Sequence, residues 1–271
     1  MTTLTPRRGE VGIGHTRIPL RGFFLVMLML LFVPIGLLFV FSVSQNRALT
    51  FPIEGLTLDW YRSIPEIEGL LGAARNSLLV GVGAATIATA LGTAVTIALL
   101  RYRFRGRGAL TAAGILPLVV PYVVLAAALL LLFRGLDLPL SLFTVGAAHV
   151  VVAMPFAILI MVARMIGMDP ALEDAAMDLG ATYPVTLRRV VIPLMGPALL
   201  SAWITCFVVS FDEVALANFL VGTGEPTFPV FLFGQLRYPL QLPSMIAMAV
   251  VLMVCTLTLT LIAERVRRRN P

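Results

Sequence analysis

EDAAMDLGATYPVTLRRVVIPL, residues 173–194, brings five charges, a glycine and two prolines together in a chain that is otherwise strongly apolar. Long apolar runs lie on both sides of this segment. A helix needs roughly 20 apolar residues to cross a bilayer core, and those runs are of that length. We therefore predict that the chain is built for lipid and leaves the bilayer at this segment.

The composition of the whole chain agrees with this prediction. Of the 271 residues, 59% are hydrophobic and 13% are charged, and the mean hydropathy is +0.98. Soluble domains carry about 25% charged residues, so water is not the main solvent of this chain. All 20 basic residues are arginine. They form short clusters between apolar runs, which favours membrane orientation over nucleic-acid binding.

Six apolar runs are long enough to cross a bilayer as helices. They cover residues 23–43, 78–100, 109–133, 142–163, 195–220 and 243–263. Asp212 and Glu213 are the only charged residues inside them. We therefore predict an all-helical membrane protein with six transmembrane helices, and bends at Pro117, Pro121 and Pro155.

The arginines predict the orientation of the six spans, because basic residues mark the cytoplasmic side. With six alternating spans, 15 of the 20 arginines fall on one side. These are Arg7, Arg8, Arg17, Arg21, Arg101, Arg103, Arg105, Arg107, Arg164, Arg188, Arg189, Arg265, Arg267, Arg268 and Arg269. An even number of spans also puts both termini on this side, so we expect both termini to be cytoplasmic.

The first half of the polar segment carries the start and stop signals of a short helix. Asp169 can cap its N-terminus, and Pro170 suits the first helical position. Gly180 can supply the left-handed residue that ends it. The spacing i, i+3, i+4, i+7 predicts a narrow apolar face made of Leu172, Ala175, Ala176 and Leu179.

The second half predicts another short helix, which begins at Pro184, carries Arg188 and Arg189, and ends at Pro193. Isolated helices under about 12 residues are marginal in water, so we expect something to pack on the pair. The alternative is an ordinary connecting loop on the membrane surface.

The segment resembles the EAA loop of ABC-importer permeases. Their pattern is E-A-A, three residues, G, nine residues, then I-x-L-P. In this chain the matching positions are Asp174, Ala175, Ala176, Gly180, Val190, Ile192 and Pro193. Asp174 stands for the family's Glu, Val190 for its Ile and Ile192 for its Leu.

The resemblance implies an inner-membrane permease of a bacterium, with five core helices, an added N-terminal helix and a MetI-like architecture. In that family the loop forms coupling helices that sit in a cleft of a separate ATPase. The residues to which the resemblance gives a coupling role are Glu173, Asp174, Ala175, Ala176, Asp178, Gly180, Arg188 and Pro193. The implied partners are a homologous second permease, a dimeric ATP-binding cassette ATPase and an external solute-binding protein.

Four further stretches look like the spermidine/putrescine branch of these permeases, and like its second, shorter permease. They are LTLDWYRSI (56–64), NSLLVG (76–81), LLRYRFRGRG (99–108) and SFDEV (210–214). A polyamine is therefore the expected solute. Importers of iron, thiamine and phosphonate have similar permeases, and these solutes remain alternatives.

The predicted organisation has four parts. Residues 1–22 form a cytoplasmic tail, 23–43 the first helix, and 265–271 a basic cytoplasmic tail. Residues 72–264 form the permease domain, with the coupling loop at 164–194.

A polar stripe on the fifth predicted span marks a candidate translocation path. Ser201, Thr205 and Asp212 fall within about 40° of one another on a helix, whereas Glu213 points about 100° away from Asp212. Intramembrane acids usually face a bundle interior or a water-filled path, which suits a cationic solute. The alternative is structural, with Asp212 near the outer interface and paired with headgroups, a partner subunit or Arg237.

The chain lacks the usual motifs of an enzyme or of a metal site. G-x-x-x-x-G-K-[ST] is absent, as are the nucleophile elbow, H-E-x-x-H and paired metal-binding cysteines. We therefore expect no catalysis, no cofactor and no metal, with ATP hydrolysed by a partner chain. The rival hypothesis is a secondary carrier or channel that uses Asp212 or Glu213 without ATP.

Overall fold

The computed structural model describes residues 20–238 and 242–269, and helices dominate them. The longer helices are α1 (Leu20–Ser42), α3 (Leu70–Arg101), α5 (Tyr122–Gly135), α6 (Leu142–Ile166), α10 (Gly196–Phe211) and α13 (Leu242–Arg269). The shorter ones are α2 (Asp59–Ser63), η1 (Ile64–Glu66), α4 (Arg107–Ile115), η2 (Leu116–Leu118), α7 (Ala171–Asp178), α8 (Tyr183–Thr186), η3 (Leu187–Val191), α9 (Ile192–Leu194), α11 (Ala215–Leu220) and α12 (Phe228–Gln235). These described ranges contain no β-strand, and one isolated bridge joins Ser44 and Leu56.

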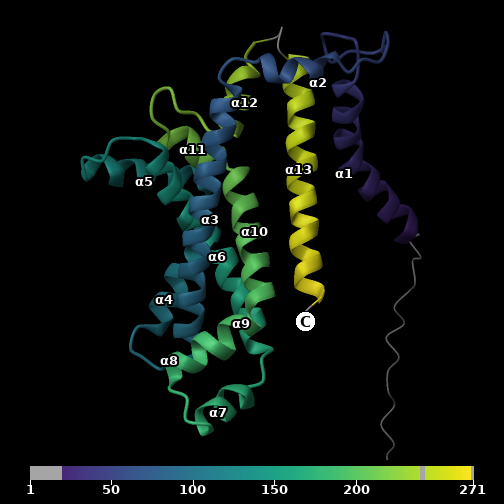
Figure 1. Cartoon of the computed structure of the whole chain (residues 1–271). Coiled ribbons are helices and arrows are strands. Elements are labelled where there is room, and N and C mark those ends of the chain that lie inside the picture. Colours follow the sequence, from purple (N-terminus) through teal and green to yellow (C-terminus); the bar gives the residue numbers. More distant parts are fainter. Residues whose placement is uncertain (1–19, 239–241, 270–271) are drawn as a thin grey trace, which may run out of the picture.

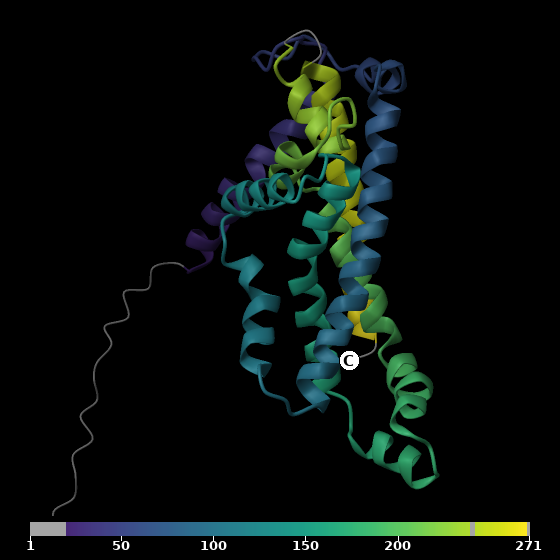
Figure 2. The same cartoon turned by 90° about the vertical axis from the view of Figure 1, so that its left-hand side faces the viewer.

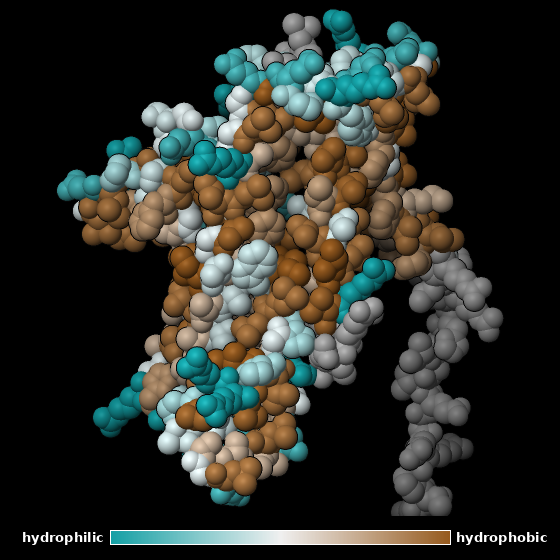
Figure 3. All heavy atoms as spheres, in the orientation of Figure 1, coloured by the Kyte–Doolittle hydropathy of each residue, from teal (hydrophilic) through white to brown (hydrophobic). Residues whose placement is uncertain are grey.

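The surface carries an apolar band between two polar ends (Figure 3). Four helices are long and apolar enough to cross a membrane, namely Gly22–Ser42, Leu70–Arg101, Leu142–Ile166 and Leu242–Val266. Two bent helix pairs raise the number to six if each pair counts as one span. The prediction of six spans therefore depends on how these two pairs are counted.

The predicted span at 109–133 is wrong as a single helix. Residues Arg107–Leu118 and Tyr122–Gly135 meet at 113°, so that α5 runs across the upright α4 (Figure 2). The predicted bends at Pro117 and Pro121 explain the break. Pro121 has no N–H to donate and disfavours helical geometry at the residue before it. Pro155, by contrast, lies within the uninterrupted α6.

The predicted span at 195–220 also divides. Its first part, α10, ends at Phe211, and α11 begins at Ala215. Asp212 and Glu213 therefore lie in the break between two helices and not inside one. The Glu213 carboxylate accepts a hydrogen bond from the Leu216 N–H at 2.9 Å, which favours a new helix start over continuation of α10.

The core forms where α6 packs against α3 and α10. Small residues allow close approach. A Cβ built on Gly92 of α3 would lie 2.6 Å from the Ala157 Cβ of α6. Thr89, Thr93 and Thr96 of α3 are buried, and the Thr96 hydroxyl donates to the Gly92 carbonyl at 2.8 Å. Such small-residue interfaces are typical of transmembrane helix packing.

The two ends of the bundle differ in structure (Figure 1). One end carries α2, α12 and the loop after α1, whereas the other carries α7, α8 and α9. The first residues of α1 and the last residues of α13 point toward the end that carries α7. α1 packs against α13 and leaves most of its apolar side chains exposed, as expected for a surface that meets lipid.

Candidate functional site

The segment that interrupts the apolar pattern folds into the elbow at one end of the molecule (Figures 1 and 2). The Asp169 carboxylate accepts the Ala171 N–H at 2.9 Å at the start of α7. Gly180 has a φ of +88°. The Ala181 N–H then donates to the Ala176 carbonyl at 3.1 Å, which is the closing hydrogen bond of a Schellman turn. The predicted end of the first short helix at Gly180 is confirmed, and the helix begins at Ala171, one residue after the predicted first helical position.

The second part of the elbow begins as predicted but ends later. α8 starts at Tyr183 with Pro184 in its first turn, and it continues through the π-turn η3 into α9. The prediction that Pro193 ends this helix is wrong, because the helix runs to Leu194. A proline lacks one helical hydrogen bond, and the wider π-turn just before Pro193 accommodates this loss. The 68° bend to α10 follows at Met195.

Most of the predicted coupling residues lie at the surface of the elbow. The exposed ones are Asp174, Ala175, Asp178, Gly180, Arg188 and Pro193, whereas Ala176 is half-buried. The predicted apolar face is also open, since Leu179 is 90% exposed and Leu172 is 47% exposed. The elbow therefore presents acidic and apolar side chains that no other part of the described chain covers.

Glu173 differs from its neighbours because it points into the chain. It is only 5% exposed. The Arg101 Nε donates to its two carboxylate oxygens at 3.0 and 3.1 Å, and the Arg101 Nη2 donates to Oε1 at 2.6 Å. Of the two adjacent acids, Asp174 is thus the one that faces outward.

Sequence reasoning missed Arg101 as a site residue. The basic run RYRFRGRG was assigned to membrane orientation, and nothing in its spacing distinguishes Arg101 from its three neighbouring arginines. The next residue, Tyr102, packs edge-on against Tyr183, with ring centroids 5.8 Å apart at 90°. Burial raises the pKa of the Tyr183 phenol, and the nearby Tyr102 and Glu173 raise it further, whereas Arg101 lowers it.

The elbow is also joined to the core of the bundle. The Arg164 Nη2, at the end of α6, donates to the Leu194 carbonyl at 3.1 Å. Val191 and Met195 are buried in the same apolar cluster as Met161 and Met165 of α6. The second half of the elbow is therefore packed on the bundle, whereas α7 projects from it (Figure 2).

The predicted polar stripe on α10 faces α13. The Ser201 hydroxyl is buried and donates to the Ala263 carbonyl at 3.1 Å. The Thr205 hydroxyl donates to the Ser201 carbonyl at 2.8 Å. Both hydroxyl donors are therefore satisfied by backbone carbonyls of α10 and α13.

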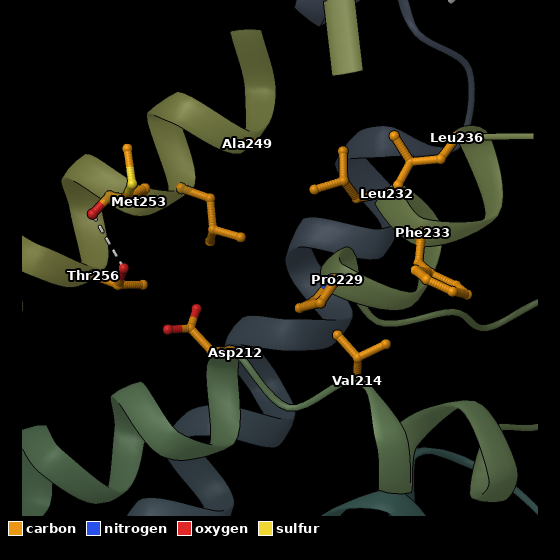
Figure 4. Close-up of a pocket in the computed structure, with 10 residues that line it drawn as sticks. Asp212, Val214, Pro229, Leu232, Phe233, Leu236, Ala249, Met253 and Thr256 are labelled. Carbon is orange, nitrogen blue, oxygen red and sulfur yellow. Dashed lines mark hydrogen bonds between the residues drawn. The ribbon is translucent and has the colours of Figure 1, made fainter. Parts of the chain in front are cut away.

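Asp212 stands at the end of α10, beside a pocket of about 350 Å³ (Figure 4). The other lining residues are Val214, Pro229, Leu232, Phe233, Leu236, Ala249, Leu252, Met253 and Thr256. Apart from the Thr256 hydroxyl, their side chains are apolar. Asp212 also borders a second hollow of about 390 Å³, which it shares with Phe32, Ile35 and Phe39 of α1. The structure thus places a carboxylate between two apolar-walled hollows.

The structure separates Glu213 from the Asp212 pocket. Glu213 is 7% exposed and is held by the Leu216 N–H. His149 is likewise buried, with its Nδ1 2.8 Å from the Ser210 hydroxyl. Within residues 20–238 and 242–269, no group of three or more His, Cys, Asp or Glu side chains is arranged to hold a metal ion.

Comparisons with known proteins agree with this geometry. Residues 88–270 match the family described as "Binding-protein-dependent transport system inner membrane component". The spermidine/putrescine transport system permease protein PotC of Escherichia coli K12 is 31% identical over 249 residues, which cover 91% of this chain and 93% of PotC. The putrescine transport system permease protein PotI of the same strain is 31% identical over 214 residues, which cover 76% of each chain.

The fold also resembles a solved structure. It superposes with a TM-score of 0.71 on a bacterial ABC transporter involved in the import of the acidic polysaccharide alginate. The superposition covers 93% of this chain and 95% of that chain at 15% sequence identity. At this identity the likeness concerns the fold alone.

Proposed function

The chain belongs to the family of binding-protein-dependent transport system inner membrane components and is a multi-pass permease component of an ABC importer, and from this premise we propose that it carries a polyamine inward, driven by a separate ATPase. Two parts of the chain support the proposal. The elbow formed by α7 to α9 is the docking element for the ATPase, and the α10 end with Asp212 lies on the solute path.

The observation that carries the ATPase role is the exposed tip of the elbow. α7 lies at one end of the molecule, beyond the long helices (Figure 1), and Asp174, Asp178 and Leu179 are exposed. An 8-residue helix is too short to be stable alone in water, and its exposed apolar side chains are best accounted for by a soluble partner. Closure of the ATPase would move α7 and, through η3 and α9, the N-terminal end of α10.

The pocket beside Asp212 supports a cationic solute with an apolar body. Its single carboxylate can pair with an ammonium group, and the apolar walls can pack against methylene groups. Spermidine and putrescine combine both features, and they are the solutes named for the two relatives with 31% identity. A polyamine therefore suits this pocket better than iron or phosphonate.

The domain organisation, the orientation in the membrane and the partner subunits complete the proposal. Residues 72–264 form the permease domain, with the coupling loop at 164–194, and 23–43 form an additional helix. We place both termini, 1–22 and 265–271, in the cytoplasm with the arginine-rich loops. Residues 1–19 and 270–271 of these termini lie outside the described residues. A homologous second permease, a dimeric ATPase and an external solute-binding protein complete the importer, and ATP is hydrolysed in the ATPase alone.

Copurification and reconstitution test the proposal. Tagged wild-type chain should retain an ATP-binding cassette subunit, and the complex in proteoliposomes should take up labelled putrescine only with ATP and the binding protein. Asp174→Arg should reduce retention of the ATPase while the chain still inserts. Putrescine uptake by the chain alone would instead favour an ATP-independent carrier, and retention unaffected by Asp174→Arg would remove Asp174 from the docking surface.

A further inference from the structure

The joint between α3 and the elbow is made by two consecutive residues that each hold a different helix. The Arg101 guanidinium donates three hydrogen bonds to the Glu173 carboxylate of α7. Tyr102 packs against Tyr183 of α8. Gly180, in its left-handed conformation, lies between these two helices. The C-terminal end of α3 therefore braces both sides of the turn.

Apart from this joint, α7 is tied to the bundle by its flanking chain and by its packing on η3. The segment Gly167–Pro170 leads into α7 from α6, and the turn at 179–182 leads out of it. The other contacts of the elbow, from Arg164 to Leu194 and from Val191 to the methionine cluster, belong to its second half. The ion pair is thus the principal side-chain link between α7 and a long span.

The geometry of the pair suits transmission of a displacement. A guanidinium that donates two parallel hydrogen bonds to one carboxylate fixes orientation as well as distance. The Glu173 and Arg101 side chains are only 7% and 21% exposed, so water competes weakly for either group. Removing one partner would leave an uncompensated buried charge, which keeps the two helices together when α7 is displaced.

We propose that Arg101 and Glu173 are positioning residues for transport, and that their ion pair passes the movement of α7 directly to α3. The inference rests on the proposed docking of the elbow on an ATPase. It adds a second route to the one through η3 and α9, which reaches α10. Because α3 packs on α6 and α10 in the core, the two routes move neighbouring helices together.

The test compares transport with ATP hydrolysis in the reconstituted complex that contains the ATPase and the binding protein. For Arg101→Gln we expect the complex to assemble and hydrolyse ATP, with putrescine uptake per ATP reduced about two- to thirty-fold, the range of known coupling mutations. Arg101→Lys should reduce uptake per ATP less, because lysine keeps the positive charge but cannot donate two parallel hydrogen bonds to one carboxylate. Arg103→Gln, two positions further along the chain and exposed, is the matched control and should change nothing.

Two results would overturn the proposal. One is an unchanged ratio of uptake to ATP hydrolysis in Arg101→Gln. The other is a loss of uptake that merely equals the loss of assembled ATPase, since the pair would then be structural only.

Hydrogen exchange separates this inference from the proposed function. In the purified chain without ATPase, Arg101→Gln should accelerate amide exchange in α7 and leave α12 unchanged, since local opening tracks the contacts that hold a segment. Unchanged exchange in α7 would show that the Arg101–Glu173 pair does not hold α7 to α3, even if the ATPase binds. Faster exchange, together with a wild-type chain that retains no ATPase, would instead refute the proposed function. The conclusion that the ion pair holds α7 to α3 would still stand.

Discussion

Asp212 and Glu213 are adjacent in the chain, but their carboxylates lie in different surroundings. Asp212 is exposed and faces the pocket between α10, α12 and α13 (Figure 4). Glu213 is buried and accepts the Leu216 N–H at the start of α11. The helix break in which both residues lie leaves the Asp212 carboxylate exposed at the pocket and buries the Glu213 carboxylate in the fold.

This difference in surroundings predicts that substitution of Asp212 affects solute uptake, whereas substitution of Glu213 affects stability. Asp212→Asn should raise the KM for putrescine uptake about fivefold, because an exposed ion pair contributes up to about 1 kcal/mol. Glu213→Ala should instead lower the stability of the purified chain by about 1 kcal/mol, since it removes a helix-capping acceptor. Uptake kinetics in proteoliposomes and thermal unfolding in detergent measure the two effects. A KM unchanged in Asp212→Asn would take this carboxylate out of the solute path.

The left-handed turn at Gly180 predicts a defect in ATPase docking. Gly180→Ala places a Cβ at a φ of +88°, which costs about 1–2 kcal/mol and disfavours the observed angle between α7 and α8. Retention of the ATPase should weaken about five- to thirty-fold.

Gly224 offers a matched control for this variant. Its φ is +83°, and a Cβ there, as at Gly180, meets nothing within 4 Å. Gly224→Ala carries the same backbone strain at the opposite end of the molecule, so ATPase retention should match the wild type. Equal losses in both variants would trace the defect to general instability.

The proposed orientation predicts where an engineered cysteine can be labelled. After replacement of Cys206 and Cys255 by alanine, Thr182→Cys should resist a membrane-impermeant thiol reagent in intact cells and react after the membrane is opened. Glu54→Cys, exposed at the opposite end, should react in intact cells. The reverse pattern would invert the topology, and both termini would then be external.

Close packing of α3 on α6 predicts opposite effects for two glycines of the same helix. Gly92→Ala places its Cβ 2.6 Å from the Ala157 Cβ, and such overpacking costs about 1–3 kcal/mol. Gly83→Ala meets nothing within 4 Å and should stabilise by up to about 1 kcal/mol through helix propensity. Thermal unfolding of both variants in detergent gives the sign. A stabilised Gly92→Ala would contradict the tight interface.

The amino-acid sequence alone was sufficient for the features that depend on local order along the chain. The length of the apolar runs predicts a membrane protein, and Asp169, Pro170 and Gly180 predict where α7 begins and ends. These signals are local, because a cap or a left-handed turn needs only residues a few positions away. The spacing around Asp174 and Gly180 was enough to indicate the permease family, which the comparisons confirm.

Tertiary structure decided which residues meet across long separations. Arg101 and Glu173 are 72 positions apart, and the sequence does not indicate which arginine of the basic loop is the partner or that Glu173, not Asp174, points inward. The breaks at 119–121 and 212–214 likewise divide two of the predicted spans, the first into two helices that meet at 113° and the second into α10 and α11. A transmembrane helix can continue through a proline or an acid when its neighbours satisfy the freed polar groups. Whether it bends is therefore settled by the packing of the helices around it.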